Sequence, residues 1–236
     1  MSMHARNMFA ASAALAMLGL ACSAPPALAQ SAHAATAEGD WSGVFHLPQS
    51  ARLALHISDA PGGGLTGKAD SPDEGASGVD IDVHQTGDNL LVSTPANGGQ
   101  RLELKWDAAN ADWTGQYFTT GGIYPITLEH GRPKPWPHVD GLDGDWTAEG
   151  TFGSTFLRLD LHVASTPATT TATVTSPDQP GVTLPVGAFS RTGDKVVFEI
   201  PVLRGDFSGQ LAADGKTLAG EYDQSNLTAP VVFTRQ

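Results

Sequence analysis

The chain has 236 residues, with 13 Lys and Arg against 25 Asp and Glu, and its formal net charge of −12 argues against nucleic acid and anionic lipid as partners. One cysteine supports neither a disulfide framework nor a Cys-rich metal site. We therefore expect stability to come from burial and hydrogen bonding, and we expect no metal and no cofactor.

The N-terminal segment has the pattern of a secretion signal. Arg6 precedes an apolar run over 8–21, and Ala27-Leu28-Ala29 forms a small-x-small cleavage site. This predicts a signal peptide over 1–29 and a periplasmic or secreted protein with a net charge of 12 − 25 = −13. The alternative is a lipoprotein anchored through Cys22, although Gly19 stands where such an anchor favours a large aliphatic residue. The apolar run is shorter than the about 20 residues of a spanning helix, so no membrane span is expected.

The rest of the chain contains one unit twice. A shift of 105 residues places "GDW" at 39–41 on "GDW" at 144–146, and "SPD" at 71–73 on "SPD" at 176–178, while a shift of 106 places "RLALHI" at 52–57 on "RLDLHV" at 158–163. A unit of about 92 residues is small but able to fold alone. The pattern predicts repeats over 38–131 and 144–236. Alternating prolines make 132–143 an extended linker between them.

Within each repeat the apolar period is two, which is typical of half-buried strands. Turn signals such as "APGGG", "TGD" and "DAANAD" separate the strands. In the first repeat we expect eight strands, at 40–46, 51–58, 64–70, 79–86, 89–94, 100–106, 112–118 and 122–129. Closing such a meander removes its edges, so the sequence predicts an all-β chain of two tandem eight-stranded antiparallel up-and-down β-barrels. A pair of β-sandwiches is the alternative.

Several motifs carry a family resemblance. The strings "GDWSG", "GGLTGKADSPDEG", "GDNLLV", "WTGQY" and "YPITL", in this order, resemble the small β-domain that precedes the catalytic domain of many bacterial secreted α/β-hydrolases, here duplicated. The Gly-x-Trp that opens each repeat is more distantly similar to lipocalin and avidin barrels. These resemblances imply a barrel fold, an exported protein and a secreted hydrolase as one candidate partner.

The lipocalin resemblance also implies how each barrel closes. In such barrels a basic residue of the last strand packs across the Trp of Gly-x-Trp. The matching pairs are Trp146 with Arg235 and Trp41 with His130. His130 departs from the pattern, because histidine is mostly uncharged above neutral pH.

Catalytic motifs do not emerge. The sequence has no Gly-x-Ser-x-Gly and no His-Glu-x-x-His, and Ala69 stands where a phosphate loop over 62–68 would need a hydroxyl. Arg52 and His56, like Arg158 and His162, lie on the strand face opposite the leucines and are interpreted as a solvent-facing stripe. No nucleophile, base and oxyanion site can be assembled, so we expect no enzyme.

Aromatic side chains are the available material for a ligand pocket. An eight-stranded barrel has room for its own side chains or for one small ligand, and the sequence leaves both open. The candidate ligand-binding residues are Trp41, Phe45, Trp106, Trp113, Tyr117, Trp146 and Tyr222. We expect a secreted, non-catalytic binding or accessory protein. The alternatives are a carrier of a small apolar ligand and, least supported, a hydrolase-associated enzyme.

Overall fold

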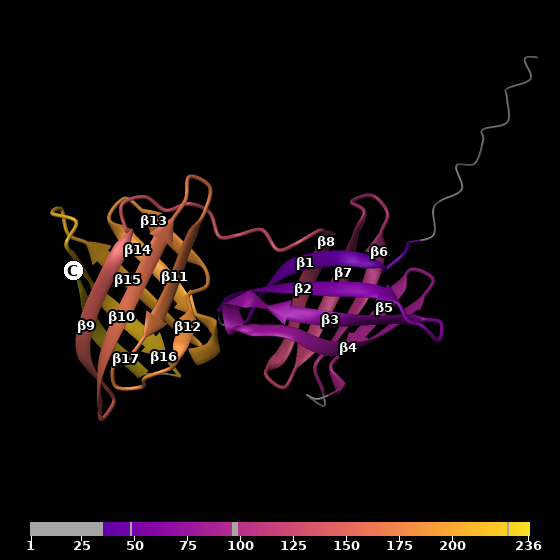
Figure 1. Cartoon of the computed structure of the whole chain (residues 1–236), viewed down its shortest axis with the longest axis horizontal. Helices are drawn as coiled ribbons and strands as arrows, with labels where there is room; N and C mark the ends of the chain where they lie inside the picture. The colour runs from indigo at the N-terminus through magenta and orange to yellow at the C-terminus, as the bar shows by residue number, and fades with distance from the viewer. Residues whose placement is uncertain (1–34, 48, 96–98, 226) are drawn as a thin grey trace, which may run out of the picture. The chain divides into compact units, whose positions relative to one another are not determined.

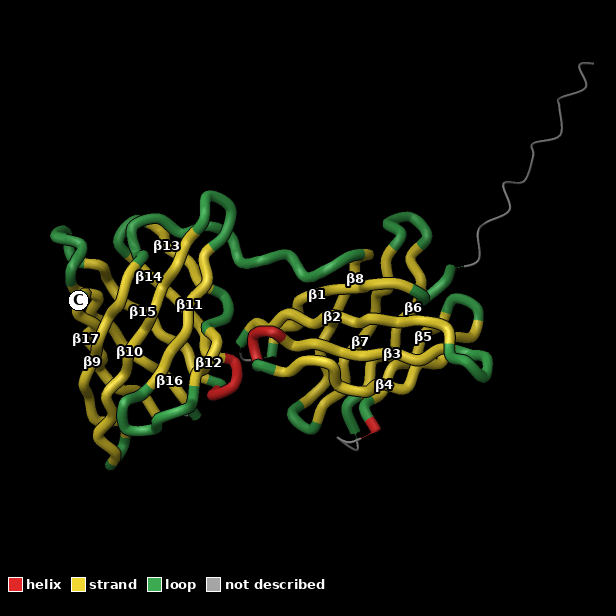
Figure 2. The backbone as a smooth tube through the Cα atoms, in the orientation of Figure 1, coloured by secondary structure: helices red, strands yellow, loops and turns green. Residues whose placement is uncertain are grey.

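The computed structural model describes residues 35–47, 49–95, 99–225 and 227–236. The predicted signal peptide over 1–29 and Cys22 lie outside the described residues. The described part is all-β, and helix there is confined to short turns (Figure 2). None of its helices has the length and apolarity that crossing a membrane requires.

The first repeat forms a closed barrel of eight antiparallel strands in chain order (Figure 1). Its strands are β1 (Gly39–His46), β2 (Ser50–Asp59), β3 (Leu65–Ser71), β4 (Ala76–Thr86), β5 (Asn89–Ser93), β6 (Arg101–Asp107), β7 (Asp112–Thr119) and β8 (Gly122–His130). Pairing of β1 with β8, with Trp41 opposite His130, closes the barrel. The predicted barrel is confirmed for this repeat, and every strand starts within three residues of its predicted start.

The second repeat forms one sheet of nine antiparallel strands. Its strands are β9 (Gly144–Phe152), β10 (Thr155–Ser165), β11 (Thr170–Thr175), β12 (Thr183–Pro185), β13 (Phe189–Thr192), β14 (Lys195–Ile200), β15 (Gly205–Leu211), β16 (Thr217–Gln224) and β17 (Leu227–Arg235). β17 pairs with β9, as β8 does with β1, but β12 and β13 are the two edges of the sheet. The closed eight-stranded barrel predicted for this repeat is therefore wrong.

The sheet stays open because one strand is interrupted. The first repeat has the continuous β4 where the second has β12 and β13, separated by 186–188. Pro185 ends β12 and has no N–H for the ladder. The connection itself spans the gap, since Val186 N–H donates to the Ala172 carbonyl at 2.9 Å and Gly187 N–H to the Glu199 carbonyl at 2.8 Å. Backbone hydrogen bonds of this connection thus link β11 to β14 at the place where the first repeat has a strand.

Each repeat has its own hydrophobic core, and a segment ahead of the first strand covers it. The Trp41 indole Nε1 donates to the Ala37 carbonyl, and Trp146 Nε1 donates to the Leu142 carbonyl, both at 2.9 Å. Leu142 and Val139 are buried in the second core. The second core therefore begins inside the segment that the sequence assigns to the linker 132–143.

Ion pairs join two of the repeated strings in each repeat. Arg52 of the "RLALHI" string donates from Nε and Nη2 to Asp73 of "SPD", at 2.9 and 2.6 Å, and its backbone N–H donates to the same carboxylate at 2.8 Å. Arg158 and Asp178 repeat this arrangement, with Nη2 at 2.6 Å from Oδ1. Both arginines fasten a strand to the turn that follows its neighbour. The predicted solvent-facing stripe is wrong for Arg52, whose side chain is 17% exposed, and holds for Arg158, whose side chain is 47% exposed.

The two clamps differ in burial. The Asp73 side chain is 1% exposed and also accepts a 3.0 Å hydrogen bond from the Trp136 indole, whereas the Asp178 side chain is 32% exposed. The Arg52 guanidinium lies 5.1 Å from the centroid of the Trp136 ring. The first half of the segment 132–143 thus helps to bury the clamp of the first repeat.

A second contact shared by the repeats lies at the Trp of Gly-x-Trp. The Arg235 guanidinium carbon is 4.5 Å from the Trp146 ring centroid, inside the roughly 6 Å range of a cation–π contact. Its Nη2 also donates to the Gly141 carbonyl at 2.6 Å. In the first repeat His130 meets Trp41 edge-on, with ring centroids 5.1 Å apart. A charged group covers the indole in one repeat and an imidazole edge does so in the other.

The buried clamp predicts unequal effects of one substitution. Asp73→Ala leaves the Arg52 and Trp136 donors without an acceptor in a buried place, so the first repeat should lose about 3 kcal/mol of stability. Asp178→Ala removes a more exposed pair and should cost the second repeat about 1 kcal/mol or less. Hydrogen exchange of the full chain, read by mass spectrometry on peptides of each repeat, measures both losses. Equal losses would contradict the assigned difference in burial.

The Trp contacts predict a second inequality. Arg235→Ala removes a cation over an indole and should cost the second repeat about 1 to 2 kcal/mol. His130→Ala removes only an edge contact and should cost the first repeat less. Arg235→Lys is the control, because it keeps the charge and should recover part of the loss in the same exchange measurement. A loss from His130→Ala that exceeds that from Arg235→Ala would show that the cation is not the important element.

Candidate functional site

The most concentrated group of titratable side chains lies on the outside of the first barrel. His56 Nδ1 is 2.6 Å from Asp40 Oδ1, and its Nε2 is 3.2 Å from Asp70 Oδ2. The hydrogen bond to Asp40 raises the pKa of His56, and the same bond lowers the pKa of Asp40. His162 and Asp145 repeat the first contact at 2.6 Å, which indicates a structural pair that both repeats share.

Metal binding finds no support at this cluster. Among the described residues, no group of three or more His, Cys, Asp and Glu side chains is placed to hold a metal ion. The search for a site therefore turns to the interiors of the two sheets.

Aromatic side chains fill the interior of the first barrel. The rings of Trp41, Trp106 and Trp113 meet edge to face, with centroids 5.2 to 6.3 Å apart. Phe45 packs against Tyr117 at 5.3 Å, and burial raises the pKa of Tyr117 to about 12. The five aromatic residues predicted to line a pocket in this repeat instead pack against one another.

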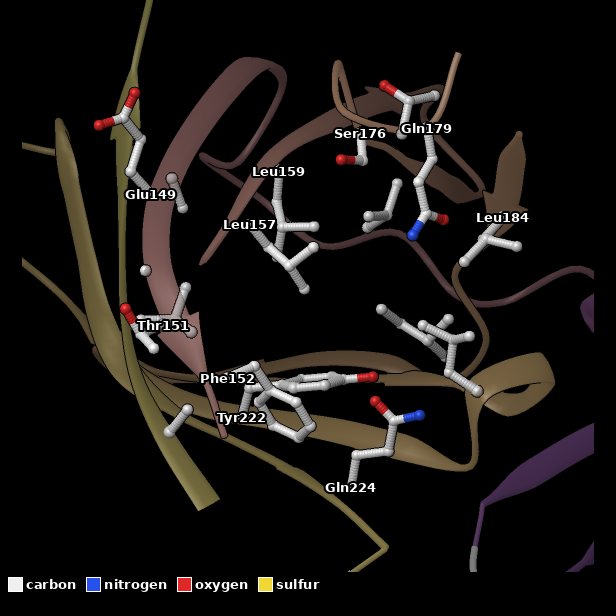
Figure 3. Close-up of a pocket in the computed structure, with 18 of the residues that line it drawn as sticks. Glu149, Thr151, Phe152, Leu157, Leu159, Ser176, Gln179, Leu184, Tyr222 and Gln224 are labelled. Carbon is white, nitrogen blue, oxygen red and sulfur yellow. The ribbon is translucent and has the colours of Figure 1, made fainter. Parts of the chain in front are cut away.

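The second repeat holds a cavity of about 270 Å³. Its walls come from β9, β10, β11, β16, β17 and the short turn after β14, and they are mostly apolar. Figure 3 shows Leu157 and Leu159 facing the rings of Phe152 and Tyr222 across this space. The other apolar lining residues are Ala148, Val174, Val182, Leu184, Ile200, Leu203, Ala229, Pro230 and Val231.

Comparison of the repeats explains why this space is open. Phe45 and Gly150 both lie four residues after the Trp of Gly-x-Trp, so Gly150 leaves out the ring that fills the first barrel. A Cβ at Gly150 would have only the Pro230 carbonyl oxygen within 4 Å, at 3.6 Å. Trp113, four residues before Tyr117, corresponds to Leu218, four residues before Tyr222. Leu218 does not line the cavity, however, and Phe233 opposite it supplies a ring where the first repeat has Leu128 opposite Trp113. The glycine at 150 is therefore the change that opens this space.

The aromatic residues that the second repeat does carry are used elsewhere. Phe189, Phe198 and Phe207 stack in series, with centroids 5.5 and 4.8 Å apart, and Phe233 meets Phe207 edge to face at 5.5 Å. All four belong to the hydrophobic core, and none of them lines the cavity. The core is therefore packed beside the cavity, and the cavity is confined to one part of the sheet interior.

Tyr222 carries a polar group beside the cavity. Its hydroxyl is buried and has no hydrogen-bond partner in the described part of the chain. Burial, with a smaller effect from the charge of Asp206, raises the pKa of Tyr222 to about 12. Gly205 makes room for the ring, because a Cβ there would lie 2.0 Å from the hydroxyl oxygen. The hydroxyl therefore lies closed in against Gly205, and Tyr222 contributes its ring to the cavity wall.

The remaining polar lining is almost free of charge. No Lys, Arg or His is among the lining residues, and the exposed Glu149 side chain is directed away from the space (Figure 3). Ser176, Gln179 and Gln224 supply neutral polar groups, and Figure 3 shows the Gln179 amide directed toward the space. The arrangement can take up an apolar molecule and offer it neutral hydrogen bonds.

Of the seven predicted ligand-binding residues, the structure places one, Tyr222, at this cavity. Trp146 lies in the core beneath Arg235, and the other five fill the first barrel. Sequence reasoning missed Leu157, Leu159 and Leu184, because a pocket was sought where aromatic residues are present. The signal in the sequence is the absence of an aromatic residue: Gly150 aligns with Phe45, whose ring points into the first barrel.

Comparisons with known proteins add little to this description. No family model matches the chain, and no curated protein matches it. A protein of unknown function of the DUF3598 family from Nostoc punctiforme PCC 73102 is similar in structure, at 11% identity and a TM-score of 0.24 over 85% of this chain and 96% of that one. A protein from Bacteroides fragilis NCTC 9343, provisionally named an outer membrane protein, matches at 12% identity and a TM-score of 0.25 over 84% of this chain and 96% of that one. TM-scores this low assign neither fold nor function.

The His56 cluster predicts a pH dependence of stability. Because the pKa of His56 is raised in the folded protein, its stabilising effect is present below its unfolded value of about 6.5 and is lost as pH rises through the folded pKa. The same contact lowers the pKa of Asp40, so its stabilising effect is also lost as pH falls through the folded pKa of Asp40. His56→Gln should therefore lower the melting temperature of the first repeat more at about pH 5.5 than at about pH 9.

His162→Gln is the matched control. The His56 and Asp40 side chains are 36% and 41% exposed, whereas those of His162 and Asp145 are 60% and 71% exposed. Exposed pairs are worth less than about 1 kcal/mol, so the control should have the smaller effect. A loss from His56→Gln that is independent of pH would refute the ionic contribution.

Proposed function

We propose that the chain is an exported, non-catalytic binding protein whose second repeat holds a small apolar ligand. The observation that carries this proposal is the cavity of about 270 Å³, whose walls are mostly apolar. Ligand sites are typically apolar with few polar groups that fix orientation. For scale, an apolar cavity of about 150 Å³ binds benzene, so about 270 Å³ suits a molecule somewhat larger than one aromatic ring.

The filled interior of the first repeat supports this interpretation. The same unit is packed with aromatic residues at 41, 45, 106, 113 and 117, so the barrel scaffold does not require a cavity. An apolar space without occupant atoms forfeits packing and lowers stability. A ligand that fills the space in the second repeat would restore those contacts. We assign the first repeat a structural role and the second the binding role.

The proposal predicts that Gly150→Phe closes the site. The fluorescence of N-phenyl-1-naphthylamine, an apolar probe, should rise on binding to the full chain. Gly150→Phe should weaken this binding at least about tenfold, because the ring occupies the space as Phe45 does in the first repeat. The variant should melt at or above the wild-type temperature, since it fills a cavity and removes a strand glycine. Mass spectrometry of organic extracts would show whether a copurified molecule disappears with it.

Two further variants keep the test informative. Val232→Phe adds the same ring to the outer face of β17, at a residue that is 48% exposed, and should leave probe binding unchanged. Leu159→Trp fills the cavity from the facing strand and replaces Gly150→Phe if that variant fails to fold. Equal probe binding by the wild type and by both filled variants would overturn the proposed function.

A further inference from the structure

Resting on the proposed function, we infer that the pocket of the second repeat binds an amphiphilic molecule end-on. The hydrocarbon part of this ligand lies in the space beside Gly150, and a small hydrogen-bonding head, such as a hydroxyl, lies at the mouth between the amides of Gln179 and Gln224. The inference rests on the order of the lining residues along the strands, on the direction of the two amides and on comparison with the first repeat.

The lining of the pocket runs from a closed end to an open end. Ala148, Gly150 and Phe152 lie on one face of β9, since successive side chains of a strand alternate, and all three line the pocket. Ala148 also belongs to the hydrophobic core and is 4% exposed. Val182, another lining residue, is 45% exposed. The space is therefore closed at Ala148 and reaches the surface at Val182.

Gln224 lies at the open end. It follows Tyr222 by two residues on β16, so both side chains are on the same face of the strand. The rings of Tyr222 and Phe152 meet with centroids 5.6 Å apart. Gln224 is one step further along the strand, opposite Leu227, which is 49% exposed. Its amide therefore lies past the two rings, where the pocket meets solvent.

Gln179 reaches the pocket from a different segment. It is exposed, and it ends the string "SPDQ" at 176–179, directly after β11. Figure 3 shows the amides of Gln179 and Gln224 directed toward the space from different sides. A primary amide offers an acceptor oxygen and two N–H donors, and a hydroxyl can both donate and accept. One hydroxyl can therefore form hydrogen bonds with both amides.

The matching position of the first repeat has a structural task. The shift of 105 residues places Glu74 of "SPDE" on Gln179. Glu74 accepts a hydrogen bond from the Ser71 hydroxyl at 2.8 Å, and its charge adds to the effect of burial in raising the pKa of Tyr117 to about 12. A carboxylate that is bonded within its own turn is thus replaced by a neutral amide that faces a space. This replacement occurs in the repeat that has the cavity.

Competition against N-phenyl-1-naphthylamine on the full chain tests the inference with two ligands of the same size. Butylbenzene ends in a methyl group where 3-phenyl-1-propanol ends in a hydroxyl. The double variant Gln179→Leu, Gln224→Leu should weaken 3-phenyl-1-propanol about fivefold, because it removes both hydrogen-bonding groups, and should not weaken butylbenzene. Retained binding of butylbenzene shows that the variant is folded.

A control variant and a longer ligand complete the design. Gln210→Leu makes the same change at an exposed residue of β15 that does not line the pocket, and it should alter neither competition. A triethylene glycol ether of 3-phenyl-1-propanol should compete as well as the alcohol, since its extension leaves through the mouth.

Three results would overturn this inference while leaving the proposed function in place. They are an alcohol-to-hydrocarbon ratio that the double variant does not change, equal weakening of both ligands by that variant, and exclusion of the ether. Probe binding that Gly150→Phe and Leu159→Trp do not weaken would instead overturn the proposed function.

Discussion

The interior of a curled β-sheet is filled by the side chains that every second residue of each strand directs inward, and the two repeats differ in how completely these side chains fill it. An eight-stranded barrel is just wide enough for its own side chains or for one small ligand. Phe45 supplies bulk in the first repeat, where Gly150 leaves it out in the second. The cavity of the second repeat follows from that difference.

Two polar contacts, in contrast, are shared by both repeats. The Arg52–Asp73 and Arg158–Asp178 clamps, and the His56–Asp40 and His162–Asp145 pairs, join the same three sequence strings in each copy. Charge-assisted, bidentate contacts of this kind fix geometry as well as contribute energy. The shared contacts explain why the chain carries "RLALHI" and "RLDLHV", and they hold one scaffold constant around two different interiors.

Much of the fold could be predicted because its signals are local. The period of two in 52–57 and the turn signals located the strands of the first repeat, and Gly-x-Trp marked where each sheet begins. The interruption at 186–188 could not be predicted, because backbone hydrogen bonds of a connection replace those of a strand there. Val139 and Leu142 were assigned to a linker, since burial of two isolated apolar residues depends on tertiary packing.

The candidate site was the hardest part to predict, for a physical reason. A cavity forms where a large side chain is absent. The aromatic residues, from which the ligand pocket was predicted, mostly fill the interior of the first repeat instead. Only the alignment of the two repeats, read at Phe45 and Gly150, contains the signal. Tyr222 was identified as a candidate, but its lack of a partner depends on Gly205 and on the surrounding burial.

Xenon binding in crystals would measure the difference between the two interiors directly, because xenon enters apolar cavities and leaves packed cores unoccupied. Crystals pressurised with xenon should show an anomalous peak among Phe152, Leu157 and Leu159 in the second repeat, and none among Trp106, Trp113 and Tyr117 in the first. Comparable occupancy in both interiors, or an empty second repeat, would contradict the assignment of a filled barrel and an open one.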